Sequence, residues 1–244
     1  MTPPARGTAL VRSATRLPTA TAMARRLVEA LGGRYSSELG IDVDASDAQV
    51  ERWFLAATLF GTRISAAVAQ RTFHVLEAAG LNRIAQARHV SWEALVALLD
   101  QGGYTRYDFR TATRLQELSD AVHERFGDDV AEIGRRYRSY PELSAQLDAL
   151  PGWGPVTVRL FLRELRGVWP GAAPPLDERA GAGARHLGLL EQHGRRDPLE
   201  VITTLARRAG LDRRDLESAL VRLTLAHGHQ HCPGGAACTL LMPP

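Results

Sequence analysis

Apolar residues recur at intervals of three and four positions along most of this chain, which is the spacing of one face of a helix. The pattern predicts helices over residues 20–32, 47–60, 64–79, 91–100, 106–126, 139–149, 155–167, 178–190, 197–209 and 212–227. No two segments show the strict alternation that is typical of paired strands. We therefore expect an all-α fold, and the lack of a fixed internal period favours a compact multi-helix globule over a solenoid.

The N-terminal segment lacks this periodicity. Residues 1–19 contain Pro3, Pro4, Gly7 and Pro18, a composition that predicts a mobile leader. The segment has no apolar stretch of the kind found in secretory signals, and no apolar run elsewhere is long enough to cross a bilayer. These features favour a soluble, cytoplasmic protein without a membrane partner, and we expect a monomer.

Composition bears weakly on the choice of partner and strongly on the chemistry that is available. The 244 residues carry 30 basic and 27 acidic side chains, so the net charge of +3 permits a polyanionic partner without demanding one. Every basic residue is arginine, which excludes chemistry that needs a lysine side chain of this sequence. The only two cysteines, Cys232 and Cys238, provide no disulfide framework, and this fits a reducing, intracellular setting.

A Gly-X-Gly turn, Gly152-Trp153-Gly154, separates two of the predicted helices. Glycines spaced in this way allow positive φ and leave the backbone uncovered, while Pro155 pre-sets φ for the first turn of the next helix. Uncovered N–H groups at a helix N-terminus suit an anion, and they fit a DNA phosphate without reading bases. The alternative is an ordinary glycine-containing connection between helices.

The residues around this turn resemble the hairpin of the helix-hairpin-helix DNA glycosylase superfamily, the endonuclease III-like group. The matching positions are Leu147, Leu150, Pro151, Gly152, Gly154 and Thr157. The similarity covers roughly residues 20–240 and includes segments 53–60, 63–65, 102–104 and 223–228 with Cys232. It implies a two-lobed fold with DNA in the groove between the lobes. Residues 48–169 would form the inner lobe, and residues 20–47 with 170–244 the second.

The resemblance also assigns contacts with DNA. It implies that the hairpin binds the duplex through Gly152, Trp153, Gly154, Pro155 and Thr157. Arg63, in the loop after the upstream apolar helix, is the candidate to fill the gap that a flipped-out base leaves in the stack. A surface arginine is the alternative for Arg63, and a place in the core is the alternative for the Trp153 side chain.

In this superfamily an essential aspartate follows the hairpin helix, and the resemblance places Asp177 at that position. A carboxylate beneath the sugar stabilises the positive charge that builds up as the base departs, and it orients a water molecule. Asp177 also suits the N-cap of the helix that begins near Glu178. Bifunctional members use a lysine just after the hairpin glycines, where this chain has Val156, so the resemblance implies a monofunctional, water-using enzyme.

Members with an iron–sulfur cluster hold it with four cysteines, whereas this chain has two, so we expect no cluster, no other cofactor and no metal. A zinc site made by Cys232, Cys238, His229 and His231 is the alternative.

The sequence thus predicts a monofunctional DNA glycosylase that acts in base excision repair on double-stranded DNA with a lesion or mismatch. A catalytically inactive helix-hairpin-helix DNA-binding protein is the alternative, because the superfamily's usual Asp-Thr-His-like continuation is absent after Asp177. Strand-nicking lyase activity is disfavoured by Val156. Alkylated, deaminated, mispaired and oxidised bases all remain candidate substrates, since specificity lies in the shape of a pocket whose residues are distant in sequence.

Overall fold

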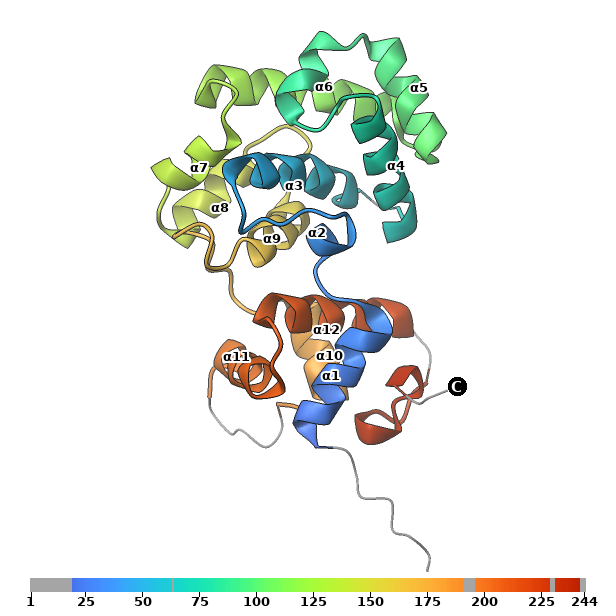
Figure 1. The fold of residues 1–244 in the computed structure, drawn as a ribbon, viewed down its shortest axis with the longest axis vertical. Coiled ribbons are helices and arrows are strands. Elements are labelled where there is room, and N and C mark those ends of the chain that lie inside the picture. Colours follow the sequence, from blue (N-terminus) through green and yellow to red (C-terminus); the bar gives the residue numbers. More distant parts are fainter. Residues whose placement is uncertain (1–18, 63, 191–195, 229–230, 242–244) are drawn as a thin grey trace, which may run out of the picture.

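The computed structural model describes residues 19–62, 64–190, 196–228 and 231–241. Within these ranges the chain is all-α and contains no strand, which confirms the predicted fold class. The helices gather into two units, one above the other in Figure 1. We call the larger one the first unit and the smaller one the second unit.

The first unit is continuous in sequence and holds most of the helices. It consists of α2 (Tyr35–Glu38), α3 (Asp47–Phe60), α4 (Ala66–Ala78), η1 (Ile84–His89), α5 (Trp92–Gly102), α6 (Asp108–Phe126), α7 (Val130–Arg136), α8 (Tyr140–Asp148) and α9 (Pro155–Glu164). Its core is aromatic as well as aliphatic, and Trp53, Phe54, Phe73, Tyr104 and Phe161 are among its fully buried members.

The second unit joins the two ends of the described chain. It consists of α1 (Ala20–Leu31), α10 (Glu178–His186), α11 (Pro198–Ala209), α12 (Arg213–His227), η3 (Gly235–Ala237) and η4 (Thr239–Leu241). α1 packs against both α11 and α12, and the Arg25 side chain donates a hydrogen bond to the carbonyl of Ala209 at 2.8 Å. Residues from distant parts of the sequence therefore lie side by side in this unit (Figure 1).

Every helix that the periodicity predicts is present, with its ends shifted by a few residues. The periodicity misses α2, η1 and α7 because each of them is too short to show a repeating face. α7 begins where the Asp129 side chain accepts a hydrogen bond from the amide of Ala131 at 2.9 Å. The boundary between the units also differs from the expectation, which placed residues 20–47 in the second lobe. In the structure, Tyr35, Leu39 and Ile41 pack into the core of the first unit.

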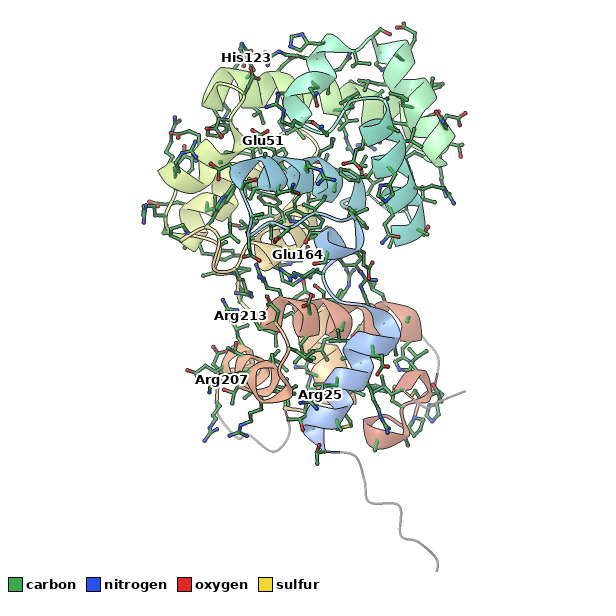
Figure 2. All side chains as sticks on the ribbon, viewed as in Figure 1. Arg25, Glu51, His123, Glu164, Arg207 and Arg213 are labelled. Carbon is green, nitrogen blue, oxygen red and sulfur yellow. The ribbon has the colours of Figure 1, made fainter. Side chains whose placement is uncertain are left out.

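Buried polar groups lie where the two units meet. Glu164, at the C-terminal end of α9, accepts hydrogen bonds from the amides of Tyr35 and Ser36 at 2.8 and 2.9 Å. Burial raises the pKa of this carboxyl, and the nearby Arg163 and these hydrogen bonds offset part of that effect. Glu164 lies in the part of the first unit nearest the second (Figure 2). Next to it, Arg166 and Glu217 form a doubly hydrogen-bonded ion pair at 2.9 and 3.0 Å, and both side chains are almost completely buried.

Candidate functional site

The hairpin predicted from Gly152 and Gly154 is present between α8 and α9. Leu147 and Leu150 are buried and anchor it to the first unit, and the Trp153 amide closes the turn on the carbonyl of Leu150 at 3.1 Å. Gly152 has a φ of 77°, in the left-handed region that favours glycine. Pro155 is the first residue of α9, as its fixed φ suggests.

Gly154 does not use the conformational freedom of glycine. Its φ is −166°, which is extended backbone open to any residue, so the expectation that both glycines serve positive φ is wrong for this one. A Cβ at Gly154 would meet no atom within 4 Å, and the amides of Gly152 and Gly154 donate to no backbone acceptor in the described ranges. The hairpin therefore presents uncovered N–H groups at the start of α9.

The side chains of Trp153 and Thr157 face inward. The Trp153 ring stacks on Phe54 with centroids 4.4 Å apart, and its indole N–H donates to Thr58 Oγ1 at 3.1 Å. Thr157 is buried against the C-terminal end of α3, where a Cβ at Gly61 would overlap its hydroxyl. Neither side chain is available to a duplex, so these two residues could contact DNA only through their backbone atoms. The missing side chain of Gly61 is what allows α9 to approach α3.

Asp177 is the N-cap of α10, and its Oδ1 accepts a hydrogen bond from the amide of Arg179 at 2.8 Å. Its other oxygen, Oδ2, lies 3.5 Å from Nε of Arg159, which projects from α9 of the first unit. The Asp177 side chain is 16% exposed. The carboxylate thus caps one helix and at the same time faces a second helix across the junction of the units.

A hollow of about 140 Å³ lies beside Asp177, between the two units. It is lined by Tyr35, Phe60, Ile64, Ala66, Val156, Leu160, Arg163, Asp177, Arg179, Val221 and Leu225. Val156, at the position of the superfamily's lysine, is half exposed at the start of α9. The structure therefore brings the start of the hairpin helix and Asp177 to the same hollow, whose walls are otherwise mostly apolar.

Arg163 is a residue of this hollow that the sequence analysis did not single out. It is 4% exposed, and its Nε and Nη2 atoms are buried without a hydrogen-bond partner in the described part of the chain. Buried guanidinium N–H groups without acceptors are costly and rare, and in a hollow they indicate a place for an acceptor. Val156, Leu160 and Arg163 share one face of α9, so an arginine on an otherwise apolar face was the available signal.

Arg63, the candidate for filling the gap in the base stack, lies outside the described residues. Its neighbour Ile64 lines the hollow, so the end of this loop borders the candidate site. A larger hollow, of about 370 Å³, lies between the start of α1 and α11. We do not assign the site to it, because it combines neither the hairpin nor Asp177.

At the C-terminal end of the second unit, His186, His227, Cys232 and Cys238 place one ligand atom each within 4.8 Å of one another. His229 of the sequence-based alternative lies outside the described residues, and His231 is exposed and does not belong to the group. Desolvation opposes ionisation of Cys232, but hydrogen bonds from the amides of Gly234 and Thr239 outweigh it and lower the pKa of its thiol to about 6. Burial raises the pKa of Cys238.

No described helix has the length and apolarity needed to span a membrane. No known protein-family model matches the sequence, and no curated protein matches it either. Function is therefore inferred from the hairpin, the hollow and the charged residues between the two units.

Proposed function

We propose that this protein is a monofunctional DNA glycosylase that hydrolyses the bond between a damaged or mispaired base and its sugar. The single observation that carries the proposal is the convergence of Val156, at the start of the hairpin helix, and Asp177 on one hollow. An exposed hairpin with uncovered amides supports the same conclusion, because it offers a phosphate contact next to that hollow.

The proposed chemistry uses Asp177 and a water molecule. As the C1′–N bond breaks, its electrons leave with the base, and the positive charge on the sugar is stabilised by the carboxylate. Water then forms the new C1′–O bond and gives its proton to Asp177, the departing base takes up a proton from solvent, and Asp177 returns its own proton to solvent. Val156 cannot form a Schiff base with the sugar, and the sequence contains no lysine to replace it. The reaction thus ends with base release and an intact sugar–phosphate backbone.

Arg159 has a defined part in this proposal. Its Nε lies 3.5 Å from Oδ2 of Asp177, so the two side chains form an ion pair beside the hollow. The same arginine is partly exposed, with 41% of its side chain accessible. A DNA phosphate that competes for Arg159 would free Oδ2 for the sugar, so the resting ion pair is compatible with catalysis.

Arg163 suggests which bases suit the hollow. Its unpartnered Nε and Nη2 groups are hydrogen-bond donors only, so they fit a base edge that carries a carbonyl oxygen or an unprotonated ring nitrogen. The apolar walls, including Tyr35 and Phe60, suit the faces of a base ring. We therefore favour oxo-bearing bases over bases that present only amino groups at this edge.

A catalytically inactive DNA-binding protein is the second candidate, and one observation favours it. Both oxygens of Asp177 face groups of the protein, Oδ1 the amide of Arg179 and Oδ2 the side chain of Arg159. A purely structural aspartate would have the same contacts. Such a protein would use the hairpin to recognise damaged DNA without releasing a base.

The test is a panel of duplexes that each carry one lesion or mismatch, assayed for base release and for strand cleavage with and without alkali. We expect the wild type to release a base from at least one duplex, with strand cleavage only after alkali and no borohydride-trapped adduct. Asp177→Asn keeps the helix cap but removes the charge, so base release should fall about 100- to 1,000-fold while binding survives.

Three results would contradict parts of the proposal. Release of no base from any duplex that the protein binds would identify the inactive binder. Undiminished release by Asp177→Asn would remove Asp177 from the mechanism, and an efficient borohydride-trapped adduct would exclude the monofunctional reaction.

Gly154→Ala tests the hairpin separately. Because Gly154 is extended and a Cβ there meets nothing within 4 Å, the variant should fold with unchanged stability. The methyl group should nevertheless weaken duplex binding, since it obstructs the approach of a phosphate to the amides. Circular dichroism of Gly154→Ala beside the wild type checks that a change in affinity does not come from misfolding. Equal affinity of Gly154→Ala and wild type would refute the placement of DNA at the hairpin.

A further inference from the structure

Two helices and one loop converge at the C-terminal end of the second unit. His186 is the last residue of α10, His227 is the last residue of α12, and Cys232 and Cys238 lie on either side of η3 in the segment that follows. The four side chains bring their ligand atoms within 4.8 Å of one another. His227 Nε2 lies 3.2 Å from Cys238 Sγ, and the two imidazole rings have centroids 4.6 Å apart.

Close backbone packing produces this convergence. A Cβ at Gly183 would collide with the carbonyl of Leu220, so this glycine allows α10 to lie directly against α12. The loop reverses at Gly234, which has a φ of 74°, and a Cβ there would collide with the carbonyl of His186. The fold therefore holds the loop with both cysteines against the ends of the two helices that carry the histidines.

One imidazole nitrogen of these four residues lacks a hydrogen-bond partner in the part of the chain that the structure describes. His186 Nε2 is buried and forms no hydrogen bond within the described residues. An imidazole nitrogen in that position loses its contact with water and gains nothing in return, unless an ion or a water molecule lies beside it. The orphaned nitrogen, together with the convergence of the four side chains, favours a further group beside His186.

The surroundings of the sulfurs fit metal ligands. The amide and the hydroxyl of Thr239 approach Cys232 Sγ at 3.5 and 3.7 Å, and hydrogen bonds of this kind stabilise a thiolate bound to a metal. Cys238 is fully buried, where it is protected from solvent and oxidants. A hollow of about 300 Å³ that includes His186, His227 and Cys232 in its lining opens next to the group and provides a path for an ion.

We propose that His186, His227, Cys232 and Cys238 bind one Zn²⁺ ion. Two thiolates with two imidazoles are a standard donor set of structural zinc sites, and Zn–S and Zn–N bonds of about 2.3 and 2.0 Å place tetrahedral ligand atoms about 3.3–3.8 Å apart. Atoms that already lie within 4.8 Å reach this arrangement by small movements of side chains. Two cysteines do not suffice for a four-thiolate iron–sulfur cluster.

The proposed site is structural, because four protein ligands complete the tetrahedron and leave no position for a substrate. It differs from the expected metal-free chain and from the sequence-based alternative, in which His229 and His231 were the histidines. Bound zinc would fasten the segment from Cys232 to Leu241 onto α10 and α12. This inference does not depend on the proposed glycosylase activity.

The test measures metal in the full chain purified without a histidine tag. We expect one zinc per chain in the wild type and in the control His231→Asn, which removes an exposed neighbouring histidine outside the group. His186→Asn and Cys232→Ser should each weaken zinc binding by at least about 100-fold. Substituting a residue that only hydrogen-bonds to a ligand already lowers metal affinity by about 10- to 100-fold, and losing the ligand itself should cost more. Co²⁺ in the wild type should give the visible bands of a tetrahedral site together with thiolate charge-transfer absorption.

The proposal is overturned if folded wild type, exposed to excess zinc, retains none, or if it contains stoichiometric iron and sulfide. It is also overturned if His186→Asn retains zinc as tightly as His231→Asn does. Should Cys232→Ser fail to fold, the Co²⁺ spectrum of the wild type and the two histidine variants still decide, because thiolate charge transfer reports the cysteines without any substitution.

Discussion

The two units of this protein have cores of different composition. The first unit buries nine aromatic side chains, namely Tyr35, Trp53, Phe54, Phe73, Tyr104, Phe126, Trp153, Phe161 and Trp169. The core of the second unit, over the described residues, contains alanine, leucine, isoleucine, valine and cysteine but no aromatic residue. Alanine at helix contacts lets α10 and α12 lie close together, but each alanine buries little apolar area.

The difference shows how each unit is held together. An aromatic side chain buries about 150–250 Å² and dominates the energetics of a core, so the first unit is stabilised mainly by its own interior. The second unit has less apolar area per residue, and it gains support from contacts at its two edges. One edge is the polar junction with the first unit, and the other is the group of two histidines and two cysteines near its C-terminal end.

The sharpest way to break this comparison is to remove one large side chain from each core. Phe161→Ala should lower the free energy of unfolding by about 4 kcal/mol, and Leu220→Ala in the second unit by about 3 kcal/mol. Native-state hydrogen exchange should show the loss at α3 and α9 for the first variant and at α10 and α12 for the second. Equal loss of protection across both units in both variants would show that the two cores unfold as one.

A substitution at the junction should have a smaller effect on stability than Phe161→Ala. Glu217→Ala leaves the buried guanidinium of Arg166 without its carboxylate and should cost about 3 kcal/mol, at the lower end for a broken buried pair. The double variant Arg166→Met/Glu217→Leu should recover most of this loss, because neither charge is then buried alone. Urea unfolding of both variants measures the difference. A double variant as unstable as the single one would show that the ion pair itself is required for the two units to dock.

The smallest effect is expected at Asp44, between α2 and α3. Hydrogen bonds from Arg214 at 2.7 and 3.0 Å lower the pKa of this carboxyl below its ordinary 3.8. A lowered pKa in the folded state stabilises the protein above pH 3.8, and this contribution is lost as the pH falls through the lowered value. Asp44→Asn should therefore cost at most about 1 kcal/mol at neutral pH, because the side chain is half exposed and solvent screens the pair.

Urea unfolding of wild type and Asp44→Asn at neutral and acidic pH checks this prediction. The difference between the two proteins should shrink as the pH falls below 3.8. A difference that stays constant with pH would mean that Asp44 acts through packing or shape, so its charge would not contribute to the junction.

Features set by interactions between residues close in sequence could be predicted, whereas features set by distant contacts could not. Helices of nine residues or more were predictable because their periodicity is local, and the hairpin was predictable because Gly152 and Pro155 have local conformational preferences. The inward orientation of Trp153 was not, since it depends on Phe54 and Thr58 of another helix.

The two sites show the same limit. In the sequence, Arg163 looks like an ordinary charged position of a helix, whereas in the structure it lines the hollow and two of its buried nitrogens have no partner in the described residues. The pairing of His186 with Cys232 and Cys238 depends on close packing of α10 against α12, which no spacing in the sequence encodes. The sequence therefore suggested His229 and His231, which are close to Cys232 along the chain, in place of His186 and His227.

The connectivity of the second unit has a consequence for synthesis on the ribosome. Arg25 in α1 and Ala209 at the end of α11 are 184 positions apart in sequence but hydrogen-bonded in the fold. At about 5–20 residues per second, α1 waits roughly 10–40 s for the helices against which it packs. The sequence of the first unit is complete only about 2–7 s before Ala209 is added, because its core extends to Ala172. Throughout the wait the nascent chain carries an unpaired amphipathic helix, a natural client for a chaperone.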